Sequence, residues 1–177
     1  MLENFSKRVG RAIFQARLEA GQRGAASIDV NSLVIGLIIE DQDPKSLELN
    51  DQHPDVKRLR QMEPRPMAVL FARECAIPRE PFFLPEVAAN LLAKLNVFLP
   101  RSNGIPPNVE MHTSPEFERA LEAAEHIRET FHHTSVQPLH LLAAIFGEPC
   151  EATRMLQEAG ITEEKVRQIL GSSAKEG

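Results

Sequence analysis

The feature that most constrains the fold of this chain is an internal duplication. Residues 151–161 read EATRMLQEAGI and residues 67–77 read MAVLFARECAI, so the two segments align with an offset of 84 residues (151 minus 67). The aligned pairs are Ala68 with Ala152, Phe71 with Met155, Ala72 with Leu156, Glu74 with Glu158, Cys75 with Ala159 and Ile77 with Ile161. A repeat of this kind indicates two copies of one structural unit, each of which can cover the apolar face of the other.

The duplication extends to the segments that precede these two. Residues 5–39 contain an amphipathic stretch, FSKRVGRAIFQARLEA, followed by the apolar SIDVNSLVIGLII. Residues 114–146 contain SPEFERALEAAEHIRET followed by SVQPLHLLAAIF. The aligned pairs, at an offset of 108, include Ala12 with Ala120, Ile13 with Leu121, Ala16 with Ala124, Ile28 with Val136 and Leu33 with Leu141. Since 108 minus 84 is 24, the first copy carries about 24 additional residues, which we place within residues 41–66.

Both stretches of each copy are predicted to be helices. Apolar residues recur at helical spacing in the second amphipathic stretch, at Phe117, Ala120, Leu121, Ala124, Ile127 and Phe131. Ser114 and Pro115 precede that stretch as a cap and a first-turn proline. The run LVIGLII (33–39) also fits a buried strand, but its counterpart is rich in Leu and Ala, which favours a helix. Asp29 and Gln137 stand where the caps of these two buried helices are expected.

The remainder of each copy is expected to be a short helix, a turn and a last helix. The short helices are predicted over 68–75 and 152–159, and the last helix of the first copy over 86–96. Gly160 suits a left-handed helix stop, and Thr162 is expected to restart the chain.

The predicted architecture is therefore all-α, with two pseudo-twofold-related repeats of about four helices each in one globular domain. The expected boundaries are repeat 1 over 1–96 with the insertion at 41–66, a linker over 97–112, repeat 2 over 113–171 and a flexible tail over 172–177.

Composition argues against several classes of function. The net charge of -5 argues against a nucleic-acid partner, and the absence of an apolar run of membrane-spanning length argues against a membrane protein. The polar N-terminus does not resemble a signal peptide. Cys75 and Cys150 lie far apart without CxxC spacing, which fits small apolar residues in a reducing cytoplasm rather than a disulfide or zinc site. The sequence holds no GxxxxGK[ST] phosphate-binding loop, so we expect no cofactor and no ATPase motor.

With this pattern established, the sequence resembles the Clp N-terminal domain family. The resemblance rests on FSKRVGRAIFQA near the start, on the apolar second helices, and on ATRMLQEAGITEEKVRQIL near the end. It covers roughly residues 1–40, 67–96 and 111–170. These are double-repeat helical domains that stand at the front of Clp AAA+ unfoldases and also occur as free-standing proteins. The resemblance implies binding of adaptors or substrate polypeptides.

In some members of that family each repeat holds an acidic site for phosphorylated arginine. The common Thr-Glu-His of the family corresponds here to Val30-Asn31-Ser32 in one copy and Pro138-Leu139-His140 in the other. A neutral residue in place of the glutamate forfeits the charge-assisted bond to a guanidinium. The departure argues against phosphoarginine binding.

Seven residues are candidates for contact with a partner, and they are Ser6, Asn31, Ser114, His140, Lys57, Arg58 and Arg60. The two serines either help a helix start to hold an anion or are ordinary helix caps. The histidine is interpreted as a hydrogen-bonded residue of the interior or of a groove. The three basic residues belong to the insertion, which is either a flexible surface loop or a loop that recognises a partner.

An alternative is a metal or acid–base site formed by Glu122, His126, Glu129 and His133, which are spaced by four, three and four residues. On one helix they would form a row suited to a metal or to acid–base work, or simply a solvated polar face. His132 and His133 also fit the loop that follows the helix. We predict no metal and no catalytic residue.

The sequence therefore predicts a non-catalytic, cytoplasmic protein-binding module. It would act as an adaptor, accessory subunit or substrate-docking domain of a Clp-type ATP-dependent unfoldase or protease, and a homodimer is possible. One alternative is the detached N-terminal domain of a longer unfoldase that binds client polypeptides directly. A less favoured one is a helical enzyme that binds a metal or small molecule.

Overall fold

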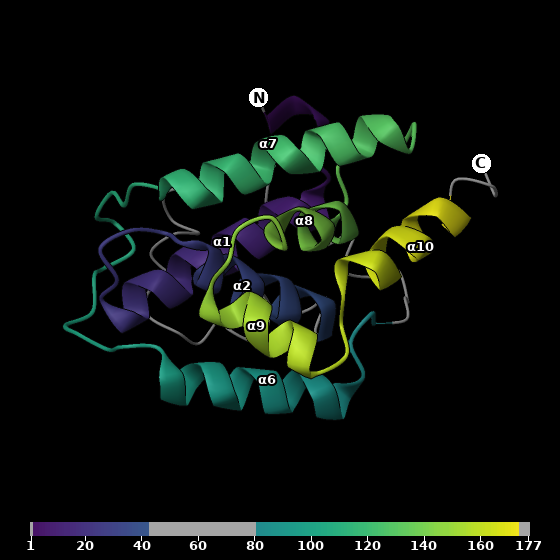
Figure 1. Cartoon of the computed structure of the whole chain (residues 1–177). Coiled ribbons are helices and arrows are strands. Elements are labelled where there is room, and N and C mark those ends of the chain that lie inside the picture. The colour runs from purple at the N-terminus through teal and green to yellow at the C-terminus, as the bar shows by residue number, and fades with distance from the viewer. Residues whose placement is uncertain (1, 43–80, 174–177) are drawn as a thin grey trace.

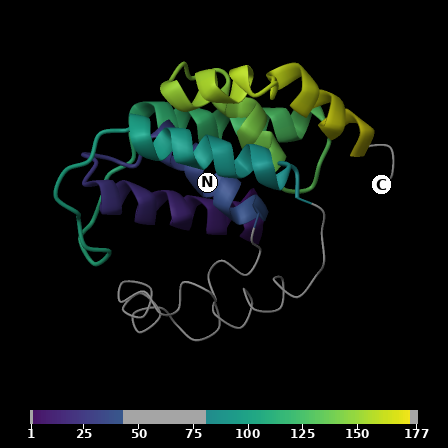
Figure 2. The same ribbon diagram turned by 90° about the horizontal axis from the view of Figure 1, so that it is seen from below.

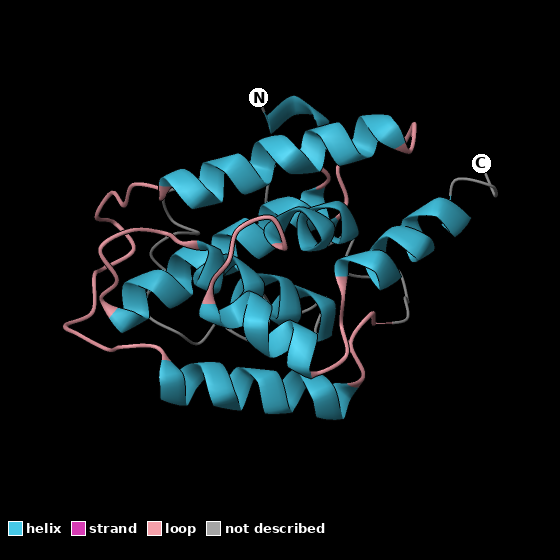
Figure 3. Cartoon of the chain, in the orientation of Figure 1, coloured by secondary structure: helices cyan, strands magenta, loops and turns pink. Residues whose placement is uncertain are grey.

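The computed structural model describes residues 2–42 and 81–173 of the chain. Within these ranges the chain is helical, and no strand longer than an isolated bridge occurs there, as Figure 3 shows. The elements are η1 (Leu2–Asn4), α1 (Lys7–Arg23), α2 (Val30–Gln42), α6 (Pro85–Phe98), α7 (Pro115–Thr130), α8 (Pro138–Ile145), α9 (Glu151–Glu158) and α10 (Glu163–Ser173). The all-α prediction is confirmed.

The helices surround α2. In Figure 1, α7 and α6 lie at opposite edges, with α1, α2, α8 and α9 between them. In the view turned by 90° (Figure 2), α1 lies at one edge while α9 and α10 lie at the opposite one. Helix α2 contacts α1, α6, α7, α8 and α9, so it is the shared centre of the core.

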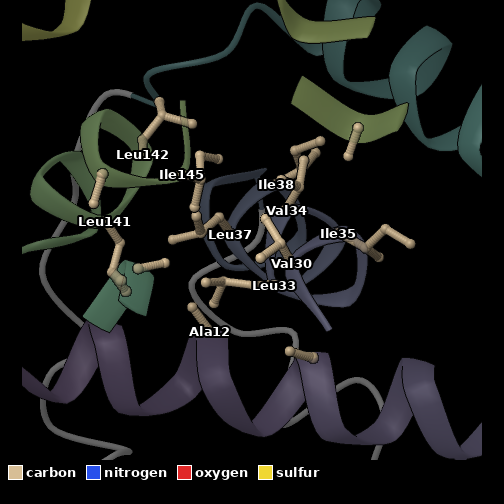
Figure 4. Packing of buried hydrophobic residues seen from close by; sticks show 14 of the residues in the cluster. Ala12, Val30, Leu33, Val34, Ile35, Leu37, Ile38, Leu141, Leu142 and Ile145 are labelled. Carbon is tan, nitrogen blue, oxygen red and sulfur yellow. The ribbon is translucent and has the colours of Figure 1, made fainter. Parts of the chain in front are cut away.

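Helix α2 is apolar on every side, which explains its central place. Between Val30 and Asp41 only Asn31 and Ile39 are less than fully buried. A helix that is hydrophobic all round is stable only when it is enclosed. Its apolar side chains meet those of α8 and α1 in the core (Figure 4). Its first turn is capped by Asp29, whose Oδ1 accepts from the Ser32 amide at 2.8 Å, as the sequence predicts.

Helices α1 and α2 approach each other so closely that only glycine fits at one position. A Cβ atom added to Gly36 would lie 2.2 Å from the Ala12 carbonyl oxygen and 2.8 Å from the Ala16 nitrogen. Both alanines are fully buried. The small residues of α1 therefore let the two backbones pack against each other directly.

The first helices of the two repeats start in the same way. The Ser6 Oγ accepts from the Val9 amide at 3.3 Å, and the Ser114 Oγ accepts from the Phe117 amide at 3.2 Å. The serines differ by 108 positions, and so do the two donors. Both hydroxyls are thus occupied as helix caps, which supports that interpretation of Ser6 and Ser114 over anion binding.

Each repeat is joined to the other by a short parallel bridge. Phe5 pairs with Val136, and Ile28 pairs with Thr113. Adding 108 to Phe5 and subtracting 108 from Val136 gives the second pair, so the two bridges are reciprocal. Their hydrogen bonds match as well: Ser6 N donates to Val136 O at 3.0 Å, and Ser114 N donates to Ile28 O at 2.9 Å.

The end of repeat 2 agrees with the expectation from sequence. Gly160 has a φ of 82° after α9, which is the left-handed stop. The Thr162 Oγ1 then accepts from the Lys165 amide at 3.3 Å at the start of α10. Helix α10 continues through Ser173, two residues into the segment that was expected to be a flexible tail.

Part of repeat 1 lies outside the described residues. This part includes the predicted short helix 68–75 and all of the insertion 41–66 except its first two residues, which belong to the end of α2. The last four residues of the expected tail also lie outside. The predicted last helix of repeat 1 is confirmed by α6.

Substitution of Gly36 in α2 and of Gly10 in α1 by alanine is expected to change the stability in opposite directions. We expect Gly36→Ala to lower the free energy of unfolding by about 2 kcal/mol or more, because the added methyl group forces α1 and α2 apart. We expect Gly10→Ala to raise it by about 0.5–1 kcal/mol, because a Cβ there meets nothing within 4 Å and alanine favours a helix interior. Urea denaturation of the two variants measures both changes. A Gly36→Ala variant as stable as the parent protein would contradict the close approach.

Candidate functional site

Two adjoining hollows follow helix α8 on the surface of the described structure. The first has a volume of about 680 Å³ and lies between the residues that follow α7, the start of α8 and the end of α10. The second, of about 370 Å³, lies between α8, Leu37 and residues 81–83. Arg8, Pro138 and Leu139 line both. We call the two hollows together the α8 groove.

The α8 groove arises where the two repeats differ. Leu139 of α8 aligns with Asn31 of α2 at the offset of 108. The Asn31 Oδ1 accepts a hydrogen bond from the Ala152 amide at 3.0 Å, so the first turn of α9 lies over the first turn of α2. Leu139 has no amide or carboxylate to offer, and its side chain lines the groove instead. The segment of repeat 1 that aligns with α9, residues 68–75, lies outside the described residues.

The floor of the first hollow is apolar, and it comes from three elements. Phe131 follows α7, Leu139 lies in the first turn of α8, and Leu170 belongs to α10. Phe131 and Leu139 are partly buried and pack against the core. A partly exposed apolar floor of this kind is typical of a surface that binds another molecule.

A pair of histidines forms one wall of the first hollow. His140 is fully buried, and its Nδ1 lies 2.8 Å from the Gln137 backbone nitrogen. Its Nε2 lies 2.8 Å from Nδ1 of His133. Because an amide can only donate, Nδ1 of His140 is an acceptor, and a neutral His140 carries its proton on Nε2 and donates to His133. A neutral His133 then carries its own proton on Nε2.

The buried member of this pair is kept neutral. Burial is the main cause that lowers the pKa of His140 from 6.5 to about 4, and the neighbouring His133 and Arg128 add to the effect. The hydrogen bond to the Gln137 backbone acts in the opposite direction. At neutral pH the pair therefore orients ring nitrogens without adding a buried charge.

Charged side chains fix other parts of the groove lining. Arg8 donates to both carboxylate oxygens of Glu40, at 3.1 and 3.0 Å, and Arg11 donates to the same carboxylate at 3.0 Å. At the second hollow the Asp41 carboxylate accepts from the amides of Phe82 and Phe83 at 2.7 and 2.8 Å. These contacts hold the wall formed by residues 81–83 against the end of α2.

The structure brings few of the predicted contact residues to this groove. Ser6 and Ser114 cap helices, Asn31 joins the two repeats, and His140 lies in the groove wall. The three basic residues of the insertion, Lys57, Arg58 and Arg60, lie outside the described residues. Sequence reasoning missed Arg8 as a groove residue and noted Leu139 only as the residue that replaces a carboxylate. The alignment of Leu139 with Asn31 was the available signal.

The polar row suggested on the first helix of repeat 2 does not come together. Helix α7 ends at Thr130, so His133 leaves the row and turns to His140. His126 and Glu129 are exposed and lie 3.9 Å apart. Within the described ranges no group of three or more His, Cys, Asp or Glu side chains could hold a metal ion. The row of four side chains on one helix is therefore wrong for His133, and the prediction that His132 and His133 belong to the loop after the helix is confirmed.

No helix among the described residues is both long and apolar enough to span a membrane.

Comparison with known proteins identifies the fold. No protein-family model matches the sequence, and no curated protein matches it. Among solved structures, the N-terminal domain of the caseinolytic protease associated chaperone ClpD from Arabidopsis thaliana is 20% identical, with a TM-score of 0.56 over 98% of this chain and 96% of that one. The Hsp104 N-terminal domain from Candida albicans is 18% identical, with a TM-score of 0.58 over 95% of this chain and 89% of that one.

A third similar structure comes from a study of a malarial protein secretion system. It is 15% identical, with a TM-score of 0.63 over 97% of this chain and 95% of that one. All three likenesses extend over nearly the whole chain. The protein therefore has the fold of the Clp N-terminal domains, as the sequence resemblance implies.

The lowered pKa of His140 predicts a dependence of stability on pH. The unfolded chain binds a proton at this residue near pH 6.5, and the folded chain binds it only near pH 4. Neutral His140 therefore contributes its full stabilisation of the folded state above pH 6.5, and this stabilisation is lost as the pH falls toward 4. We expect this group alone to remove about 2 kcal/mol from the free energy of unfolding between pH 7 and pH 5.

Urea denaturation at the two pH values measures this loss in the parent protein and in His140→Gln. The variant should lack that part of the pH dependence, whatever its stability at pH 7. His126→Gln is the matched control, since its side chain is 83% exposed, and it should keep the pH dependence of the parent. Equal pH dependence in His140→Gln and the parent would contradict the assignment.

Proposed function

We propose that this protein is a non-catalytic protein-binding module that docks a polypeptide segment in the α8 groove. Its role would be that of an adaptor or accessory subunit of a Clp-type ATP-dependent unfoldase or protease, in the cytoplasm. The observation that carries the proposal is the partly exposed apolar floor of the groove, on a fold that solved Clp N-terminal domains share. Apolar hollows with polar walls are the usual form of docking sites for peptides.

The side chains of the groove support binding rather than catalysis. Both nitrogens of His140 are engaged, one by a backbone amide and one by His133. The Ser135 hydroxyl, which lines the same hollow, accepts from Gln137 Nε2 at 2.8 Å and is not paired with a base. Activation of a hydroxyl nucleophile requires an adjacent base in hydrogen-bond contact. The arrangement therefore favours a surface that holds a partner.

A second candidate function is direct binding of unfolded clients, with this domain attached to a longer unfoldase. One of the similar structures is the N-terminal domain of a protease-associated chaperone, which favours this candidate. It uses the same groove and differs only in the partner. The two candidates are separated by whether the groove prefers a folded unfoldase subunit or an unfolded chain.

Substitution of the groove floor tests the proposal. Leu139→Asp places a charge on the apolar floor, and we expect it to weaken binding of the partner by about tenfold or more, since burial of an unpaired carboxylate is costly. The variant should still fold, because an acidic residue in the first turn of α8 interacts favourably with the helix dipole.

Binding is measured by fluorescence anisotropy with a purified Clp-type unfoldase subunit from the same organism and, separately, with a reduced, carboxymethylated client polypeptide. Val97→Asp is the control, because this residue of α6 is 88% exposed and lies away from the groove. A partner that binds Leu139→Asp and the parent protein equally well would refute the groove as the docking site. If Leu139→Asp loses binding only to the unfoldase subunit, the adaptor role is supported. If it loses binding only to the client polypeptide, the second candidate is supported.

A further inference from the structure

We infer that the α8 groove selects polypeptide segments whose apolar side chains are flanked by carboxylates. The inference rests on the proposed function and names the chemistry of the segment that the groove accepts. It follows from the charges that line the hollows, from an unused hydrogen-bond donor and from the apolar floor between them.

The first hollow is lined by basic and neutral side chains only. Arg8, His132 and His133 are its basic lining residues. No aspartate or glutamate is among the described residues that line this hollow, although the whole chain carries a net charge of -5. A hollow that contains an arginine and no carboxylate is electrostatically complementary to an acidic segment. It offers no favourable charge contact to a basic segment.

The carboxylates nearest to the groove are already bound. Glu40 is 1% exposed and is held by the guanidinium groups of Arg8 and Arg11. Asp41, which lines the second hollow, accepts from two backbone amides and is 6% exposed. Glu40 offsets part of the charge of Arg8, but two guanidinium groups share this one carboxylate, so the cluster of Arg8, Arg11 and Glu40 keeps a net positive charge beside the groove.

Arg8 and His133 retain N–H donors that could bind a carboxylate. A guanidinium has more N–H donors than the two with which Arg8 contacts Glu40. In the same hollow, the tautomer set by Gln137 and His140 leaves the proton of a neutral His133 on Nε2. That atom is shielded from water and has no acceptor among the described residues. A carboxylate oxygen would supply one once a side-chain movement in the hollow uncovers this atom, which is a gain because an unpaired buried donor is costly.

The apolar floor favours a ligand that has apolar side chains as well as charge over a small anion. Phe131 and Leu139 are only partly buried and line the same hollow as Arg8, so a bound segment gains most when it covers these two side chains as well. The ligand chemistry is therefore a short apolar run with acidic residues on its flanks.

Three synthetic peptides test the inference on the full chain by fluorescence anisotropy. Each has the same central Leu-Phe-Leu run, flanked on both sides by glutamates, glutamines or lysines. We expect the glutamate peptide to bind about tenfold more tightly than the glutamine peptide, and the lysine peptide to bind most weakly. Higher salt should reduce these differences.

Two arginine variants show where the preference arises. Arg8→Gln should bring the affinities of the glutamate and glutamine peptides within about threefold of each other, because it removes the cation from one wall. Arg154→Gln is the matched control, since Arg154 is an exposed arginine that lines neither hollow of the groove, and it should keep the preference. Leu139→Asp should weaken the glutamate and glutamine peptides, because it removes an apolar contact and adds a negative charge to the floor.

The outcomes separate the inference from the proposed function. If all three peptides bind equally and Leu139→Asp weakens the glutamine peptide, the groove binds polypeptide but the charge selection is wrong. If a neutral peptide with the sequence of residues 67–77 binds more tightly than the glutamate peptide, the groove is made for this chain's own segment and the inference is overturned. If no peptide binds the parent protein, the inference and the docking function both fall.

Discussion

Enclosure of helix α2 is the constraint on which the described structure depends. The helix is apolar on all sides, and among the described residues it is contacted by α1 and α6 of repeat 1 and by α7, α8 and α9 of repeat 2. The absence of a side chain at Gly36 brings α1 against one face, and repeat 2 covers others. The reciprocal bridges at Phe5 and Ile28 then fix the entry of each repeat against the other. The duplication in the sequence is thus a requirement of the core.

The groove follows from the places where the two copies have diverged. Ser32 and His140 occupy aligned, fully buried positions, and each is paired with a side chain from the end of the preceding helix or the loop after it. In repeat 1 the buried Arg23 donates to the Ser32 hydroxyl at 2.5 Å, whereas in repeat 2 the partner is His133. One residue earlier, an asparagine binds α9 and a leucine faces the groove. A symmetric scaffold therefore presents an asymmetric surface.

Much of the fold could be predicted because its signals are local. Helix periods, the serine caps and the glycine stop after α9 depend on neighbours within a turn, and the repeat resolved the ambiguous run 33–39. The site depends on contacts between distant segments, such as Arg8 with Glu40, which no local pattern reports. The row that included His133 failed because α7 ends at Thr130 and His132 adopts a φ of 57°, so the chain leaves the helical period there.

The central claim is that the two repeats form one cooperative unit around α2. Native-state hydrogen exchange in increasing denaturant tests it most directly at the bridge amides of Ser6, Ile28, Ser114 and Val136, together with the amides of α2. The account predicts that all of them exchange through one opening, with the free energy of global unfolding. Exchange of Ser114 and Val136 at a clearly lower free energy than the amides of α2 would show that repeat 2 opens on its own, and would contradict the account.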